Sequence, residues 1–373
     1  MAPVDEATFD GDDFSNNLFT DLAPLLTLFG EQVTKQFLSL SLSWADNVLL
    51  AMGPLGIMTV VVSAIRVGGG PLLRALVGRA REEKALVEQE LLSSTSEEIC
   101  EMWNGTAIVR TKGKPASPMK TLVITADGRV LSLPQLKQDE DKDDRLYDIK
   151  GAKRATGPET GFSQGLIPWE AVVVNAPPNL TLNLQNTSAQ TSEIWAFALL
   201  GVVLQAVALV VPALATYRWR LDEDGKKDAR SYGYPCYLIG SVLLIAGILG
   251  CGHVIEGATR EITFKCRKEH RNNVAVVRLQ EACTVGDQYF PRVALFNSFD
   301  NPDISVSVWN IKNLKSHSHL ATLSTGLAIP GFVIQFVGLR ALHWSASVIQ
   351  LGITFVMTAV RAWVRRGITR KPP

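Results

Sequence analysis

The sequence predicts an α-helical multi-span membrane protein, with about five spans and a small β-rich domain outside the bilayer. Two apolar runs, Ile194–Tyr217 and Cys236–Ile255, contain no charged side chain. A third apolar stretch, Leu320–Val360, contains a single interior charge at Arg340. The polar segments between these runs contain short apolar stretches of the kind that form half-buried strands.

The two charge-free runs predict one transmembrane hairpin. A helix needs roughly 20 apolar residues to cross the ~30 Å hydrocarbon core, and both runs reach that length. The connector between them, Arg218–Arg230, is rich in charged residues that are costly to bury in lipid. We therefore assign spans to residues 194–217 and 236–255.

Leu320–Val360 is too long for a single crossing. Its 41 residues would form a helix of ~61 Å, about twice the thickness of the core. We expect two spans, 320–339 and 344–360, that turn at Arg340–His343. Residues 361–373 then form a basic tail.

The stretch Asn47–Ile65 is the first predicted span, and its sequence leaves two arrangements open. Gly53, Pro54 and Gly56 interrupt the helix, because proline removes a backbone donor and clashes with the preceding turn. The segment either crosses the membrane as a kinked helix or enters and leaves as a re-entrant loop. We expect a kinked span over residues 47–65.

The chain before this span divides into two parts. Residues 1–17 are acidic and lack the features of a cleavable signal peptide, so we expect a disordered acidic tail. Residues 18–44 repeat apolar positions with a helical period, which predicts an amphipathic helix. The pattern fits a helix packed on the membrane domain and a helix lying among the lipid headgroups equally well.

Two polar segments, 66–193 and 256–319, form the predicted extramembrane lobes. In the first, residues 72–92 have an amphipathic helical pattern. Overlapping capping boxes at Ser94 and Thr95 predict a short helix that reaches Trp103. Strands are predicted at residues 106–110, 120–125, 129–133, 169–174, 262–264, 274–279, 292–296 and 304–309, and a solvated loop at 137–154.

The two lobes are expected to form one composite domain. Two spans separate 66–193 from 256–319, so both segments face the same side of the membrane. Each segment alone is small for a hydrophobic core. We therefore expect strands from both segments to share one β-rich domain that rests on the bundle.

The distribution of basic residues predicts that this domain is cytosolic. With five spans and the N-terminus outside, seventeen Lys and Arg near span ends fall on the cytosolic side and seven on the other. Glycosylation sequons at Asn104, Asn179 and Asn186 would indicate the opposite orientation if they were used. We give the charge asymmetry more weight and expect unmodified asparagines and reduced thiols at Cys266 and Cys283.

The sequence contains no recognisable catalytic motif, so we expect neither an enzyme nor a bound cofactor. The net charge of +1 lacks the basic surplus that nucleic-acid binding needs. His253 and Glu256 share one helical face near a span end and are weak metal candidates. An interfacial polar pair is the simpler interpretation, because no third or fourth ligand is evident. His317 and His343 lie at opposite ends of the fourth span and are not expected to meet.

The predicted spans contain uncharged polar side chains at Gln205, Gln335 and Gln350. Such residues line a path through a channel or transporter, or they hydrogen-bond helices to one another. Ion and proton pathways usually also place charged residues inside the membrane, and the predicted spans have none. This lack favours helix packing.

Five stretches carry a resemblance to known sequences: Asp21–Leu38, Ala51–Ile57, Ser63–Gly69, Ser93–Gly105 and Thr284–Gln288. They resemble a family of uncharacterised fungal multi-span membrane proteins, some of which carry ankyrin repeats after the last span. The resemblance implies a multi-pass integral membrane protein and implies no activity. The ankyrin repeats are absent from this sequence, so partner binding through them is not implied.

Two functions remain in view. The first is a non-enzymatic integral membrane protein whose composite lobe binds a protein partner or senses a ligand. The alternative is a channel or transporter that acts as a homo-oligomer and uses the span glutamines. In both cases the lipid bilayer is the implied surrounding, and nucleic acid is not a partner.

Overall fold

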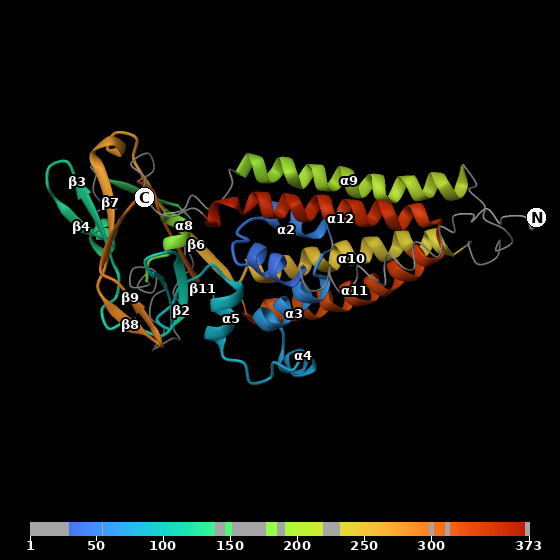
Figure 1. Ribbon diagram of the computed structural model, residues 1–373, viewed down its shortest axis with the longest axis horizontal. Coiled ribbons are helices and arrows are strands. Elements are labelled where there is room, and N and C mark those ends of the chain that lie inside the picture. Colours follow the sequence, from blue (N-terminus) through green and yellow to red (C-terminus); the bar gives the residue numbers. More distant parts are fainter. Residues whose placement is uncertain are drawn as a thin grey trace, which may run out of the picture.

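The computed structural model describes residues 30–53, 55–138, 146–150, 177–184, 191–218, 232–297, 302–309 and 314–369. The chain has two parts, a bundle of long helices and a β-rich lobe at one end of that bundle (Figure 1). We call the end of the bundle that meets the lobe the lobe end.

Four helices are long and apolar enough to cross a membrane. They are α9 (Thr191–Tyr217), α10 (Gly233–Glu256), α11 (Leu314–Arg340) and α12 (Trp344–Val364). Outward-facing positions such as Leu199, Val203 and Phe332 are exposed, as lipid-facing side chains are in a bundle taken without its bilayer. The last helix continues past Val360, so Arg361 belongs to α12 and not to a basic tail.

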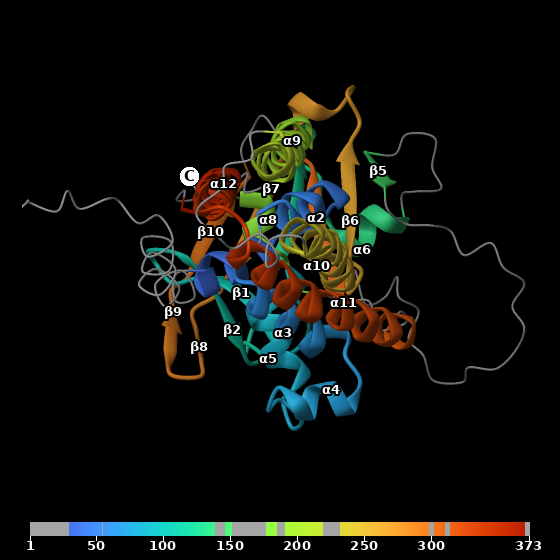
Figure 2. The same cartoon turned by 90° about the vertical axis from the view of Figure 1, so that its right-hand side faces the viewer.

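The helices α10 and α11 pack against each other along most of their length (Figure 2). A Cβ atom on Gly247 would lie 2.5 Å from the backbone nitrogen of Ala328, and one on Gly331 would lie 2.6 Å from the nitrogen of Leu244. Small residues allow two backbones to approach this closely, which replaces the hydrophobic driving force that lipid removes.

The predicted first span is wrong in its path. It forms two short helices, α2 (Trp44–Ala51) and α3 (Ile57–Gly68). The Trp44 ring stacks on His253 at the lobe end, with 4.9 Å between ring centroids. A Cβ atom on Gly68, at the far end of α3, would lie 2.6 Å from a methyl group of Val254. Both ends of the segment are therefore at the lobe end, and the segment folds back as a hairpin, which is the shape of the re-entrant alternative.

The length of each helix and the backbone at the bend explain this path. At 1.5 Å per residue, 8 and 12 residues give helices of roughly 12 and 18 Å, short of the hydrocarbon core. Gly56 precedes α3 with φ +66°, a left-handed conformation that glycine adopts without strain. The chain reverses there instead of continuing as a kinked helix.

Shorter helices surround the hairpin at the lobe end. Residues 30–38 are helical, and Phe37 and Leu38 are buried against the bundle. The described part of the 18–44 segment is thus packed on the membrane domain. Residues 1–29, with the predicted acidic tail, lie outside the described residues. The expected helix over 72–92 is two helices, α4 (Pro71–Leu76) and α5 (Lys84–Leu91), because Gly78 turns the chain with φ +72°.

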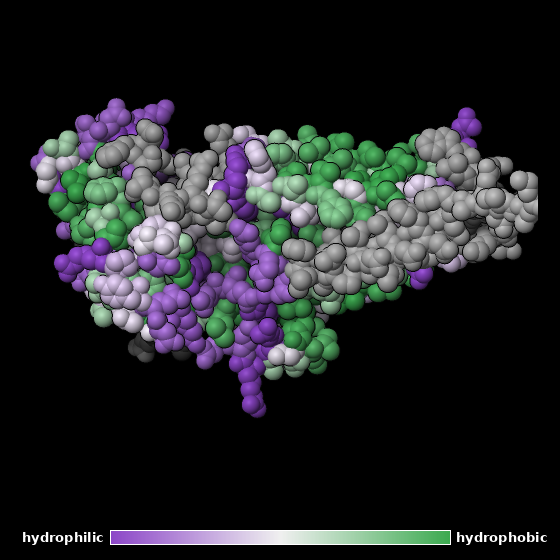
Figure 3. All heavy atoms as spheres, in the orientation of Figure 1, coloured by the Kyte–Doolittle hydropathy of each residue, from purple (hydrophilic) through white to green (hydrophobic). Residues whose placement is uncertain are grey.

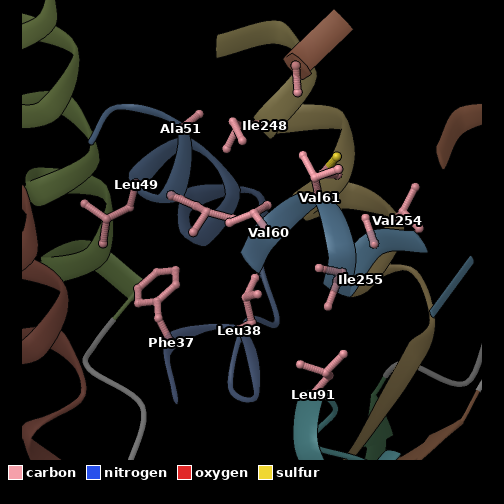
Figure 4. Close-up of a cluster of buried hydrophobic side chains, with 14 of the residues drawn as sticks. Phe37, Leu38, Leu49, Ala51, Val60, Val61, Leu91, Ile248, Val254 and Ile255 are labelled. Atoms are coloured by element: carbon pink, nitrogen blue, oxygen red, sulfur yellow. The ribbon is translucent and has the colours of Figure 1, made fainter. Parts of the chain in front are cut away.

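The hydrophobic core of the bundle gathers around the hairpin. Figure 4 shows Leu49 of α2, Val60 of α3 and Ile248 of α10 in one cluster, with Phe37 and Leu91 at its lobe side. All of these side chains are almost fully buried. The hairpin therefore fills the lobe half of the bundle and leaves the outer faces of α9 and α12 toward lipid.

The β-rich lobe combines strands from both polar segments. From the first come β1 (Ile99–Trp103), β2 (Ile108–Lys112), β3 (Lys120–Thr125), β4 (Val130–Ser132) and β5 (Tyr147–Lys150). From the second come β6 (Thr259–Cys266), β7 (Val274–Gln280), β8 (Cys283–Val285), β9 (Gln288–Phe290), β10 (Val293–Phe296) and β11 (Ile304–Trp309). One sheet has the order β10-β7-β3-β4 and another has β11-β6-β5, and each of these two sheets contains strands from both segments, whereas the pairs β1-β2 and β8-β9 each come from one segment. The short helices α6 (Leu133–Gln138) and α8 (Leu180–Leu184) and the 3-10 turns η2 (Arg271–Asn273) and η4 (Arg366–Thr369) complete the fold.

Several local predictions for the lobe need correction. The short helix expected up to Trp103 is the strand β1, and the Ser96 hydroxyl accepts a hydrogen bond from Ile99 N in a turn instead of capping a helix. The loop expected over 137–154 contains β5, whose Tyr147 is buried. The β8–β9 hairpin was not predicted. The strand expected at 169–174 lies outside the described residues.

Candidate functional site

His253 and Glu256 lie together at the lobe end of α10. The Nδ1 atom of His253 is 3.2 Å from Oε2 of Glu256, and the Asn47 amide donates to the same oxygen at 2.6 Å. Trp44 covers one face of the imidazole. Among the described residues no group of three or more His, Cys, Asp and Glu side chains could hold a metal ion. The pair therefore ties α10 to α2 at the membrane boundary.

A second histidine joins this pair, which the sequence did not indicate. The ring of His317 is 6.5 Å from that of His253, between centroids. The two residues are far apart in the chain, and only the antiparallel packing of α10 and α11 brings them together. His343 is at the opposite end of α11, where its Nδ1 accepts from Ser345 N at the start of α12.

Two of the three span glutamines connect helices. The Gln335 amide donates to the Ser241 hydroxyl at 3.0 Å, which joins α11 to α10. The Gln350 carbonyl accepts from the Tyr237 hydroxyl at 3.0 Å, which joins α12 to α10. Gln205 is buried in α9 and has no hydrogen-bond partner among the described residues. Hydrogen bonds between helices, such as those of Gln335 and Gln350, stabilise helix association in lipid.

Arg361 is the buried charge that the sequence analysis assigned to a tail. Its side chain is 1% exposed, and its Nη2 donates to the carbonyl oxygens of Leu50 and Gly53. These carbonyls are at the C-terminal end of α2, where a helix has unpaired acceptors and partial negative charge. Arg361 therefore caps α2 from a helix that is remote in sequence.

The neighbouring arginines continue this contact with the N-terminal part of the chain. Arg365 forms a buried ion pair with Asp46 at 2.9 Å and stacks on the Phe37 ring at 4.5 Å. Arg366 pairs with Glu193 at the start of α9, at 2.8 Å. The segment that follows Val360 is thus part of the folded lobe end as far as it is described.

A second ion-pair group holds the other arm of the hairpin. Arg66 of α3 donates to both carboxylate oxygens of Glu82 and pairs with Glu90 at 2.5 Å. Glu90 also pairs with Lys35 of the helix at 30–38. These pairs connect α3 to α5 and to the N-terminal helix.

The lobe has an unusual outer surface on the sheet β10-β7-β3-β4. The strand register places ten side chains on one face: Lys120, Leu122, Ile124, Val130, Ser132, Ala275, Val277, Leu279, Ala294 and Phe296. Eight of these are apolar, and we call this set the apolar sheet face. Ile124 is 37% exposed, Leu279 38%, Phe296 45% and Val130 54%. Figure 3 shows hydrophobic atoms at the outer end of the lobe, where β3, β4 and β7 lie.

The opposite face of the same sheet packs inside the lobe. Val123 and Val276 lie in one cluster with Ile262 and Val306 of the neighbouring sheet. Arg278 is fully buried there and donates to Asn297, and burial lowers the pKa of its guanidinium to about 10. One face of this sheet therefore has its partner within the chain, and the other does not among the described residues.

The sequons differ in accessibility. Asn179 is fully buried, its amide donates to Ser93 O at 2.8 Å, and its carbonyl accepts from Ser307 N at 2.9 Å. An N-linked glycan at Asn179 is incompatible with these contacts. Asn104 is in an exposed turn, and Asn186 lies outside the described residues. All five cysteines are free thiols.

The chain matches no protein-family model, and neither a curated protein nor a solved structure is similar to it. The site must therefore be interpreted from its own residues. The features that stand out are the arginine-capped hairpin inside the bundle and the apolar sheet face on the lobe.

Proposed function

We propose that this chain is a non-enzymatic membrane protein that binds a protein partner through the apolar sheet face of its lobe. The exposure of Ile124, Val130, Leu279 and Phe296 on one side of one sheet is the observation that carries the proposal. Large exposed apolar patches on soluble lobes are typical of interaction sites. A partner that covers this face would remove these side chains from water.

The geometry of the glutamines supports this proposal over a channel or transporter. Gln335 and Gln350 form hydrogen bonds between helices. The buried Arg361 is likewise engaged with backbone carbonyls of α2. Gln335, Gln350 and Arg361 thus contribute to helix packing, whereas the exposed side chains of the apolar sheet face are not used in the lobe core.

The orientation that accompanies the proposal is a cytosolic lobe. With the hairpin re-entrant, Lys35 moves to the lobe side, and six basic residues near span ends remain on the opposite side. Basic flanks are retained on the cytosolic side. Asn179 is buried, so its sequon does not argue against this orientation.

A site-specific photocrosslinker in the full-length protein tests the proposal. We expect a crosslinker at Phe296 to give one discrete adduct in intact cells. The matched control position is Tyr289, which is 65% exposed in the β8–β9 hairpin and is not on the apolar sheet face. A second substitution, Ile124→Glu, introduces a charge into the face and should abolish the adduct at position 296.

The mass of the adduct identifies the kind of partner. An adduct of twice the chain mass would make the partner a second copy, and any other discrete mass would indicate a different protein. If position 296 gives no adduct, or gives the same adducts as position 289 and is insensitive to Ile124→Glu, the proposal is wrong.

A further inference from the structure

The most exposed large apolar side chains of the described chain are not on the lobe sheet but on α4. Leu72 is 79% exposed and Leu76 is 76% exposed. The helix has only six residues, and none of them is buried. Figure 1 and Figure 2 both show α4 standing away from the other helices beside α3. Two leucines held in this way present apolar surface to the surroundings of the protein.

The position of α4 places it at the boundary of the membrane. A Cβ atom on Gly68, the last residue of α3 and three residues before α4, would lie 2.6 Å from Val254 and 3.4 Å from His317, and one on Gly70 would lie 3.4 Å from the Ser318 hydroxyl. His317 is the first residue of the span His317–Arg340. The chain therefore leaves the bundle beside the start of a candidate transmembrane helix, where the headgroups of a bilayer would lie.

The residues after α4 provide the complementary charge. Arg79 and Arg81 are exposed, and the Arg79 side chain retains 52% exposure although it lies 3.5 Å from Glu82. Glu82 forms its closer ion pair with the buried Arg66. The exposed side chains of Arg79 and Arg81 can therefore bind groups in the solvent. Figure 3 shows a hydrophobic projection at the place of α4 next to the hydrophilic segment that leads to α5.

We infer that α4 is an interfacial anchor that inserts Leu72 and Leu76 into the acyl boundary and places Arg79 and Arg81 against anionic lipid headgroups. Apolar residues on a short helix with adjacent basic side chains are the pattern of membrane-surface binding. Anionic lipids are concentrated in the cytoplasmic leaflet, and basic residues near that surface attract them. This inference uses a different surface from the partner-binding proposal, and only its preference for anionic lipid rests on the cytosolic orientation proposed there.

Lipid-selective quenching of a fluorophore in the full-length protein tests the inference. An NBD label at Leu76→Cys is studied in phosphatidylcholine vesicles that contain spin-labelled phosphatidylserine or spin-labelled phosphatidylcholine at equal trace amounts. The native chain treated with the same reagent gives the background from its five cysteines. Val130→Cys, 54% exposed on the lobe, is the matched control position.

We expect both spin-labelled lipids to quench the label at position 76 and neither to quench it at position 130. Spin-labelled phosphatidylserine should quench more strongly. The double variant Arg79→Gln/Arg81→Gln should remove this preference. Each arginine that is replaced should lower the binding of phosphatidylserine relative to phosphatidylcholine by about fivefold.

Leu72→Cys provides a second labelling position if the Leu76 variant does not elute as a monodisperse species. Absence of quenching at these positions would show that α4 stays in water, and the inference would be wrong. Equal quenching by the two lipids in the native background would show that α4 inserts without anionic preference, which overturns the role of the arginines.

Discussion

The α10–α11 pair and the α2–α3 hairpin occupy the same bundle but are held in different ways. The α10–α11 pair depends on glycines: Gly247 and Gly331 have no side chain and so allow the two backbones to approach. The hairpin depends on long side chains, because Arg361 and Arg365 reach it from α12 and Arg66 connects it to α5. A region held by small residues is insensitive to pH and salt, whereas a region held by arginines depends on each charged partner.

The largest expected effect is the loss of the Arg361 cap. The substitution Arg361→Met leaves the Leu50 carbonyl without its guanidinium donor, and an unsatisfied buried group costs about 1–3 kcal/mol; the Gly53 carbonyl loses one of its two donors and keeps Leu55 N. We expect the free energy of unfolding to fall by about 2–4 kcal/mol in SDS titrations of mixed micelles. Arg361→Lys, which keeps the charge, should recover part of the loss.

The matched control for this prediction is Arg366→Met, in the same basic cluster. Arg366 is exposed and pairs with the partly exposed Glu193, so its contribution should stay below about 1 kcal/mol. Equal stabilities of the Arg361→Met and Arg366→Met proteins would remove the distinction between the hairpin and a peripheral basic segment.

The helix pair is tested by adding one methyl group. In Gly247→Ala the new Cβ would lie 2.5 Å from Ala328 N, so the helices must separate, and overpacking of this kind costs about 1–3 kcal/mol. Gly326→Ala on α11 has no atom within 4 Å of its Cβ position and should be neutral or stabilising by up to about 1 kcal/mol. The same titration measures both, and a neutral Gly247→Ala would mean that α10 and α11 are not in close contact.

The lobe, like the hairpin, is held by buried polar side chains with specific partners, and Asn179 is one of them. Asn179→Ala removes hydrogen bonds to Ser93 O and Ser307 N and should cost about 2 kcal/mol. Asn104→Ala, in an exposed turn, should cost less. We also expect glycosidase treatment to leave the mobility of the native protein unchanged. A mobility shift that is lost in Asn179→Ala would contradict the buried position of this side chain.

The smallest effect concerns the protonation of Glu88. Burial raises the pKa of Glu88 above its ordinary value, and the hydrogen bond from the Ser94 hydroxyl at 2.7 Å offsets this only in part. A pKa that is higher in the folded than in the unfolded state adds stability at acidic pH, and this stability is lost as the pH rises through the folded pKa. Glu88→Gln should therefore match the native protein at low pH and be more stable at neutral pH.

The stability of Glu88→Gln as a function of pH checks this, by an effect smaller than that of Asn179→Ala. Glu97→Gln removes the same negative charge from an exposed position and is the control. If the two variants have the same pH profile, burial of Glu88 has no energetic consequence.

The same contrast explains what could be predicted from the sequence. The spans α9 to α12 follow from continuous apolar runs, and β3 and β11 follow from their β-branched residues, because these signals are local. The re-entrant path was one of two arrangements open from the sequence, but it could not be chosen over a kinked span, since the Arg361 side chain that contacts Leu50 is 311 positions away. The short helix predicted from the capping boxes before β1 was wrong because pairing with β2 overrode a local helix signal.

The candidate sites divide in the same way. The spacing of His253 and Glu256 indicated their contact, and the structure has it. The apolar sheet face required the register between β3 and β7, which joins two segments separated by two spans. Alternation in one strand indicates that a face exists, but only the pairing shows which apolar positions assemble on it.

The arginine cap also determines when the first hairpin can be completed during synthesis of the chain. The first hairpin emerges early, but the side chain that completes it follows 311 residues later. At 5–20 residues per second, that interval is roughly 15–60 s during translation. Until α12 is in place, the carbonyls at the end of α2 have no guanidinium, and the hairpin is held by its apolar contacts with α10 and by the ion pairs of Arg66. The last helix therefore acts as the closing step of assembly, and a chain interrupted before it would leave the ribosome with its first hairpin unfinished.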